Sequence, residues 1–360
     1  MPEINRLEQK IRAHMADLER DGLRRTLRPP TGIDLSSNDY LGLASHPAVK
    51  QRMVEAVQEF GCGSTGSRLL RGDRPCFTAV EAKFARFKGA QRALYFSSGY
   101  LANLAVLTTF PESSDTVFSD ELNHASLIDG VRLSRATRQI YPHLVPPASA
   151  RDHFLVTESL FSMDGDIAPL HDLAATGAIL IVDEAHAVGI YGAAGSGLLE
   201  EAGVTAFLSI NPCGKALGVA GAFVAGPEWA IEYMIQRARP FIFSTAPPPA
   251  VAAALDASLD IIVAEPQRRA RLRTLARYLR AKLGLPGDSP IIPIIAGDND
   301  RSVALAAELQ SEGFDVRAIR PPTVPVGTAR LRISVNVNLT EEILDRFVTC
   351  LEKARCTAFS

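Results

Sequence analysis

The chain has 360 residues, of which 47% are hydrophobic and 22% charged, and its formal net charge is −2. Such a composition is typical of a globular protein with room for two packed units, and the weak net charge argues against nucleic acid as the main partner, since phosphate binding needs clustered Lys and Arg. No apolar run approaches the roughly 20 residues of a membrane span. The five cysteines form no metal-type pair, and residues 1–28 lack the apolar core of an export signal, so we expect a cytoplasmic protein with reduced thiols and no bound metal.

The first predicted element is a helix over residues 3–28, in which Ile4, Leu7, Ile11 and Met15 recur at three- and four-residue intervals. Farther along, short apolar runs alternate with helical or turn segments. The runs are residues 93–96, 116–119, 154–158, 178–183, 207–210 and 221–225. This alternation predicts a largely parallel sheet with helices on both faces, which places functional residues at the carboxyl ends of its strands.

The pattern changes after three consecutive prolines at residues 247–249. Residues 250–284 predict one or two long helices, and strands are expected at 291–295, 316–319 and 330–335, around a helix at 300–312. We therefore expect an N-terminal helical segment, a large α/β domain and a small C-terminal α+β domain. Their predicted bounds are residues 1–40, 41–260 and 261–360.

Two motifs point to functions that their surroundings argue against. Residues 61–66 match the dinucleotide fingerprint G-x-G-x-x-G, but they follow a predicted helix and not a strand. Residues 183–186, Asp-Glu-Ala-His, spell a helicase motif that works with a phosphate-binding loop. The nearest match to such a loop, Gly214-Lys215-Ala216, lacks the hydroxyl that holds magnesium and comes after the motif, in the reverse of the helicase order.

Lys215 and Asp183 give the strongest indication of chemistry. Lys215 lies in a turn of small residues between two strand-like runs, where burial would favour a neutral, nucleophilic amine. Asp183 follows an apolar strand, and a carboxylate there is costly to bury without a cationic partner. That partner could be the protonated nitrogen of a pyridine ring, and the alternative is that Asp183 caps a helix. An amine and a carboxylate in this relation are what pyridoxal phosphate requires of a protein.

The other groups that pyridoxal phosphate needs follow other predicted strands. Residues 97–103 open a helix, so their backbone amides, with Gly99 for close approach, form a natural phosphate site. His124 lies in a polar turn and could stack on a flat ring. His186, three residues after Asp183, could reach the phenol oxygen of that ring, although a structural role would equally explain a histidine taken alone.

These residues belong to a series of motifs that resembles the α-oxoamine synthases, which are fold-type-I pyridoxal-phosphate enzymes. The resemblance runs from residue 36 to about residue 335. Its motifs are residues 36–42, 61–66, 98–100, 123–126, 157–165, 182–186 and 214–215. It implies a transferase with a large domain built on a mostly parallel seven-stranded sheet and a smaller C-terminal α+β domain.

The resemblance implies a role for each matching residue. Lys215 would bind the cofactor covalently and move protons, Asp183 would pair with the pyridine nitrogen, and His186 would bond the phenol oxygen. His124 would stack on the ring. Further cofactor contacts would come from Gly99, Tyr100, Ser162, Ser244 and Thr245. The last two resemble a segment that reaches the phosphate of a neighbouring subunit, which implies a homodimer with active sites at the subunit interface.

The resemblance also implies the substrates. Residues 319–325, Ile-Arg-Pro-Pro-Thr-Val-Pro, resemble the branch that condenses L-alanine with a pimeloyl thioester of CoA or a carrier protein, in biotin biosynthesis. Arg332 would grip the amino-acid carboxylate with help from Asn38, and Thr323 and Arg24 would contact the substrate. The alternatives are a sister enzyme, such as glycine C-acetyltransferase or 5-aminolevulinate synthase, and a non-catalytic binding protein on the same fold.

One position departs from the family pattern. Relatives carry Thr three residues before the cofactor-binding Lys, where its hydroxyl helps to bind phosphate, and this chain has Pro212 there. One phosphate contact is therefore lost, and Asn211 or Ser209 is expected to replace it.

Overall fold

The computed structural model describes residues 2–358, which form two compact units. The large unit consists of Asn38–Ser162 and Asp166–Leu272, and the small unit of Met1–Ser37, Met163–Gly165 and Arg273–Ser360. In this division the N-terminal residues belong with the C-terminal part of the chain. The three-part division expected from the sequence stays a prediction, and its end residues 1, 359 and 360 lie outside the described part.

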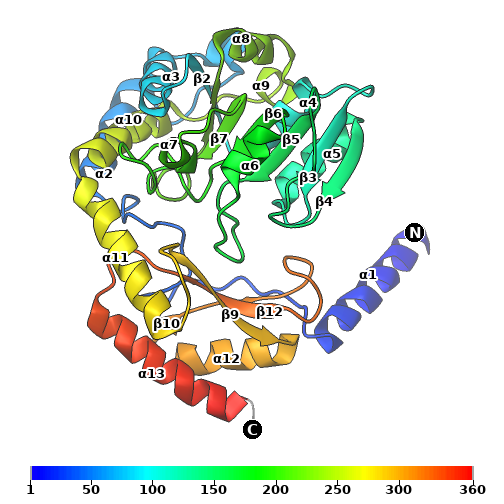
Figure 1. Ribbon diagram of the computed structural model, residues 1–360, viewed down its shortest axis with the longest axis vertical. Coiled ribbons are helices and arrows are strands. Elements are labelled where there is room, and N and C mark those ends of the chain that lie inside the picture. The colour runs from blue at the N-terminus through cyan, green and yellow to red at the C-terminus, as the bar shows by residue number, and fades with distance from the viewer. Residues whose placement is uncertain (1, 359–360) are drawn as a thin grey trace. The chain divides into compact units, whose positions relative to one another are not determined.

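The large unit is built on one seven-stranded sheet (Figure 1). Its strands are β2 (Arg92–Phe96), β3 (Thr116–Asp120), β4 (Thr137–Tyr141), β5 (Phe154–Glu158), β6 (Ile179–Asp183), β7 (Leu208–Pro212) and β8 (Ala222–Gly226). Their order is β2-β8-β7-β6-β5-β3-β4, and only the β8 pairings are antiparallel. The predicted, mostly parallel seven-stranded sheet is confirmed.

Helices pack on both faces of this sheet. They are α2 (Pro47–Phe60), α3 (Pro75–Lys88), α4 (Gly99–Thr109), α5 (Ala125–Ser134), α6 (Leu170–Ala175), α7 (Leu198–Ala202), α8 (Glu228–Arg237), α9 (Arg239–Ile242) and α10 (Pro249–Ala264), with a π-helical turn at Arg68–Gly72. Side chains alternate between the two faces of a strand. On β8, Val224 joins the apolar cluster of α4 and α8, whereas the preceding Phe223 stacks on Phe84 of α3 at 4.2 Å between ring centroids.

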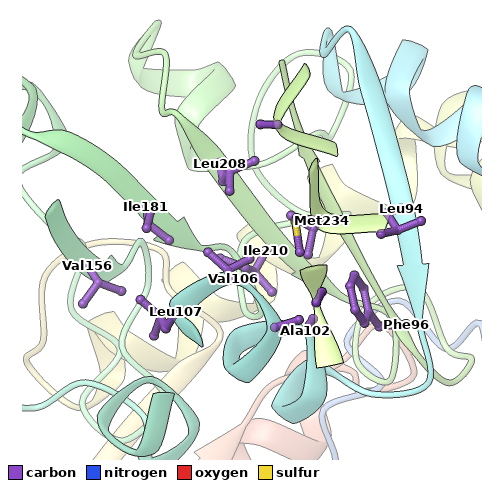
Figure 2. Close-up of a cluster of buried hydrophobic side chains, with 14 of the residues drawn as sticks. Leu94, Phe96, Ala102, Val106, Leu107, Val156, Ile181, Leu208, Ile210 and Met234 are labelled. Atoms are coloured by element: carbon purple, nitrogen blue, oxygen red, sulfur yellow. The ribbon is translucent and has the colours of Figure 1, made fainter. Parts of the chain in front are cut away.

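The cluster on the α4 side fixes the sheet to its helices (Figure 2). Val106 of α4 and Met234 of α8 are fully buried there with Val156, Ile181 and Ile210, which come from three adjacent parallel strands. Removing so much apolar surface from water is the main force that holds the layers together. The carboxyl ends of these strands are therefore held in fixed positions, and the segments that follow them carry the candidate site.

The small unit contains two short sheets. Strands β11 (Ala318–Ile319), β12 (Ala329–Ser334) and β9 (Ile291–Gly297) form an antiparallel sheet in that order, and β1 (Ile33–Asp34) pairs with β10 (Phe314–Asp315). Its helices are α1 (Pro2–Arg20), α12 (Asn299–Ser311) and α13 (Glu341–Ala358), and α11 (Pro266–Lys282) spans the boundary of the two units. The predicted C-terminal α+β character is confirmed.

One helix prediction needs correction, and a second is confirmed in its two-helix form. The first helix ends at Arg20 and not at residue 28, because Gly22 adopts a positive φ of 63° and the Leu23 N–H turns back to the Leu18 carbonyl at 2.7 Å. Residues 250–284 form two helices, α10 and α11, which meet at Pro266, since proline cannot donate the hydrogen bond that a continuous helix requires. Within residues 2–358, no helix combines the length and apolar character needed to cross a membrane.

Candidate active site

A chain of hydrogen bonds begins at Lys215, in the turn after β7. Its Nζ lies 2.8 Å from His186 Nε2, and His186 Nδ1 lies 2.7 Å from the Tyr40 hydroxyl. Tyr40 in turn donates to Asn38 Oδ1 at 3.2 Å. His186 and Tyr40 are buried and Lys215 is half-buried, so the amine is held in a recessed position. Tyr40 has no role predicted from the sequence.

A second chain of hydrogen bonds begins at Asp183, at the end of β6. Asn103 of α4 donates from Nδ2 to Asp183 Oδ2 at 2.7 Å and to Ser126 Oγ at 2.8 Å. Ser126 Oγ lies 2.7 Å from His124 Nδ1, so the network joins β6, α4 and the start of α5. The other Asp183 oxygen accepts the Ala185 N–H at 2.9 Å. One oxygen therefore caps the turn, and the other faces the network.

Burial lowers the pKa of His124 from its ordinary value; the charge of Asp183 acts against this shift, and that of Lys215 adds to it. A lowered pKa favours the neutral imidazole at physiological pH. A neutral imidazole is suited to lie against an aromatic ring.

The start of α4 approaches the end of β7 closely. Ser98 caps the helix by accepting the Leu101 N–H at 3.2 Å. A Cβ atom on Gly99 would lie 2.7 Å from Pro212 Cγ, so only glycine fits there without displacement of the proline ring. Tyr100 is 42% exposed, and its hydroxyl bonds Asp129. Pro212, the residue that departs from the family pattern, therefore packs so closely on the start of α4 that it requires glycine at position 99.

The proposed substitute for the missing Thr hydroxyl is not supported at Asn211. Asn211 is fully buried, and its Nδ2 donates to Ser209 at both the carbonyl oxygen, at 3.1 Å, and Oγ, at 3.0 Å. The amide donor is thus already engaged within β7. The remaining amide oxygen has no partner in the structure and is an acceptor, which cannot replace a donor to phosphate.

The other residues named from the sequence lie in several places. Ser162 is half-buried, and Ser244 and Thr245 line a small cavity of about 20 Å³ together with Phe96 and Ser97 of the same chain. Three of them belong to the small unit. Arg332 is buried on β12 and donates to Ser334 Oγ at 2.7 Å, Arg24 pairs with Glu19 at 2.8 Å, and Thr323 is exposed in a turn.

Glu184, which follows Asp183, has a structural environment. Its carboxylate is completely buried and forms an ion pair with Lys88 of α3, which is also buried, and it accepts the Leu199 N–H at 2.9 Å. Lys88 also donates to the Ser196 carbonyl at 2.6 Å. These contacts explain the acidic residue that gave this segment its similarity to a helicase motif.

Replacing Lys88 by methionine is expected to destabilise the fold by about 3–5 kcal/mol, because it leaves the Glu184 charge buried without its partner. Urea unfolding measures the change. The matched control is Lys83→Met on the same helix, because Lys83 pairs with Asp256 at 2.9 Å in a more exposed setting. The control should lose about 1 kcal/mol or less. Equal losses in both variants would contradict the account of Glu184.

The residues at the carboxyl edge of the sheet fit pyridoxal phosphate. Asp183 is 3% exposed, and the hydrogen bonds it accepts come from two neutral groups, the Asn103 amide and the Ala185 N–H. A protonated ring nitrogen would supply the cationic partner that a buried carboxylate needs. Lys215 offers a recessed amine, and His124 offers a flat ring of lowered pKa.

Comparison with known proteins agrees with this fit. The aminotransferase class I and II family model matches residues 30–351. The chain therefore belongs to the aminotransferase class I and II family.

Two proteins similar to this chain are 8-amino-7-oxononanoate synthases. The 8-amino-7-oxononanoate synthase of Burkholderia lata is 45% identical over 94% of this chain and 95% of its own length. That of Anaeromyxobacter dehalogenans is 44% identical, over 95% and 94%.

Solved structures show the same fold. The 8-amino-7-oxononanoate synthase of Francisella tularensis superposes with a TM-score of 0.80 at 31% identity, covering 91% of this chain and 99% of its own. A serine palmitoyltransferase variant from S. paucimobilis, solved with PLP and myriocin bound, gives a TM-score of 0.88 at 28% identity, covering 97% of this chain and 98% of its own.

Proposed function

We propose that this chain is a pyridoxal-phosphate-dependent acyltransferase that condenses L-alanine with a pimeloyl thioester, giving 8-amino-7-oxononanoate, CO2 and the free thiol in biotin biosynthesis. The observation that carries the proposal is the convergence of Lys215, His186 and Asp183 at one edge of the sheet. The 44–45% identity to relatives of that name over nearly the whole chain supports the choice of reaction. Sister activities are less favoured, since the serine palmitoyltransferase from S. paucimobilis is 28% identical.

The bound cofactor supplies an electron sink for the bond-breaking steps at the amino acid. Lys215 would hold the cofactor covalently until the amino group of alanine takes its place, and the freed Nζ would then remove and return the proton at the α-carbon of alanine. His186, 2.8 Å from that amine, holds it in place and bonds the cofactor's phenol oxygen. Asp183 would stabilise a protonated ring nitrogen, and His124 would pack on the ring. Electrostatic groups fixed before reaction in this way are effective because they need no reorganisation.

Other residues are proposed to bind the phosphate and the substrates. Gly99 and Tyr100, at the start of α4, and Ser162 contact the cofactor. Arg332 binds the alanine carboxylate, for which a guanidinium fork is well suited, and Asn38 assists. Thr323 and Arg24 contact the thioester substrate.

The active enzyme is proposed to be a cytoplasmic homodimer in which Ser244 and Thr245 reach the phosphate of the second copy. Phe243, directly before them, is 70% exposed in the single chain. Packing this ring against a second copy would remove its apolar surface from water. The same contact would bring the two hydroxyl residues toward the neighbouring subunit.

A panel of substrates tests the reaction. Release of CoA thiol is followed with L-alanine, glycine or L-serine against pimeloyl-, acetyl-, succinyl- and palmitoyl-CoA. We expect the highest kcat/KM for alanine with pimeloyl-CoA, by at least about tenfold, since a poorly filled apolar site loses roughly 1–3 kcal/mol of transition-state binding. A preference for glycine with acetyl- or succinyl-CoA would assign the chain to a sister enzyme.

A further inference from the structure

Glu158, the last residue of β5, is a buried carboxyl group to which the proposed reaction gives no role. Only 2% of the Glu158 residue surface is exposed to solvent. It pairs in register with Asp183 on the adjacent strand β6. Neighbouring strands lie about 4.8 Å apart and paired residues project to the same face. Two carboxyl groups therefore lie side by side at the edge of the sheet that carries Lys215.

The hydrogen bonds of the two carboxyl groups differ. Asp183 accepts from Asn103 and Ala185, whereas the Glu158 carboxyl interacts through hydrogen bonding only with the backbone N–H of His124, and its Oε1 is buried without a hydrogen-bond partner within residues 2–358. A buried, unpartnered carboxylate oxygen is costly, and a proton reduces that cost because it neutralises the group. The geometry thus favours Asp183 as the charged member of the pair and Glu158 as the neutral one.

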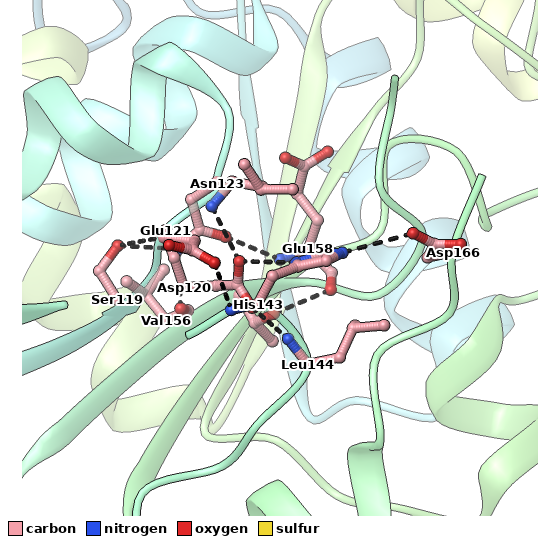
Figure 3. Close-up of polar contacts among 11 residues, drawn as sticks. Ser119, Asp120, Glu121, Asn123, His143, Leu144, Val156, Glu158 and Asp166 are labelled. Atoms are coloured by element: carbon pink, nitrogen blue, oxygen red, sulfur yellow. Dashed lines mark hydrogen bonds and ion pairs between the residues drawn. The ribbon is translucent and has the colours of Figure 1, made fainter. Parts of the chain in front are cut away.

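The backbone holds Glu158 firmly in this position. Its N–H donates to Asn123 Oδ1 at 3.2 Å, and Asn123 Nδ2 donates to Ser119 Oγ and the Val156 carbonyl, both at 2.9 Å. Figure 3 shows these contacts beside the hydrogen bond between His143 and Asp120. These bonds fix the main chain from which the Glu158 side chain projects.

Burial and groups on neighbouring elements act on the pKa of the Glu158 carboxyl. Burial is the largest influence and raises its pKa to about 8. The charges of Asp183 on β6 and Asp120 on β3 act in the same direction, while Lys215 after β7 and the backbone amide of His124 before α5 act against it.

We propose that Glu158 is a positioning residue that works as a neutral carboxylic acid, and that loss of its proton to solvent ends activity at alkaline pH. Once ionised, Glu158 competes with Asp183 for the cations of the site, the Lys215 amine and the ring nitrogen of the bound cofactor. The neutral acid leaves Asp183 as the single negative charge facing them. The effect on activity depends on the proposed function, whereas the protonation state of Glu158 does not.

The protonation state is tested on the cofactor-free protein by comparing Glu158→Gln with the wild type. Between about pH 4.5 and 8 the folded wild type keeps a proton that the unfolded chain has lost, so its stability falls as pH rises. Glutamine carries no such proton. The Tm of E158Q relative to the wild type should therefore rise by about 4 °C between pH 5.5 and 7.5. The control Glu112→Gln, at an exposed site, should show no such trend.

Activity provides the second measurement. In the wild type, kcat/KM should be about tenfold lower at pH 9 than at pH 7, as expected when a required proton is lost near pH 8. In E158Q the ratio between these two pH values should stay close to 1, and E112Q should behave as the wild type.

Two results would overturn the proposal: a Tm difference that does not change with pH, or an alkaline fall of kcat/KM in E158Q equal to that of the wild type. If E158Q does not fold, infrared spectra of the cofactor-free wild type decide the point. A carboxylic-acid carbonyl band should disappear between pH 7 and pH 9, and its absence at pH 7 would refute the neutral acid. Failure of the substrate assignment would leave the stability and infrared results unchanged, so the two failures can be distinguished.

Discussion

Replacing Lys215 by alanine is expected to lower kcat by at least about 10³-fold, because the chain loses both the covalent attachment of the cofactor and the amine that moves the substrate proton. His186 lies 2.8 Å from this amine and cannot replace it, since an imidazole forms no such attachment. Activity with alanine and pimeloyl-CoA measures the loss of the amine that moves the proton. Reduction with borohydride, followed by mass analysis of the peptide that contains residue 215, measures the loss of covalent attachment.

The control for this experiment is Lys50→Ala, an exposed lysine at the start of α2. It should keep the activity and the borohydride-reduced cofactor on Lys215. A K215A protein that retains more than a tenth of wild-type kcat, or cofactor attached to a different lysine, would show that the anchor has been misassigned.

The second large effect is expected at Asp183. Asp183→Asn keeps the size of the side chain but removes the negative charge that faces the ring nitrogen, and kcat should fall on the order of 10²- to 10³-fold, as for other fixed electrostatic groups. The hydrogen bond from Asn103 is also affected, so Tm is measured beside kcat. The exposed Asp172→Asn serves as the control. A D183N enzyme with its Tm preserved and kcat within threefold of the wild type would contradict the role of the carboxylate.

Most of the large-unit sheet could be predicted, because its parallel strands are buried on both faces and appear as short apolar runs. Strand β4 was missed for the opposite reason. It lies at the sheet edge, only Tyr141 is buried, and the run Thr-Arg-Gln-Ile-Tyr has no apolar pattern. The end of α1 was missed because the helical periodicity outweighed the signal of Gly22.

Candidate site residues could be proposed from the sequence where a residue's local setting indicates its chemistry, and their roles stay predictions. Lys215 among small residues and Asp183 after an apolar strand are such cases. Tyr40, Asn103 and Glu158 were not predicted, since their importance comes from partners distant in the sequence. Tyr40 meets His186 across 146 positions, and Asn103 meets Asp183 across 80. All three lie inside or beside recognised motifs, which was the available signal.

Alanine labelled in its carboxyl carbon tests the central claim most directly. The purified protein, loaded with pyridoxal phosphate, is mixed with this alanine and pimeloyl-CoA, and labelled CO2 and free CoA are measured together. We expect equal amounts of labelled CO2 and free CoA. Release of CO2 should require pimeloyl-CoA, and release of CoA should require alanine. CoA release without labelled CO2, or no release with pimeloyl-CoA while glycine and a shorter thioester react, would contradict it.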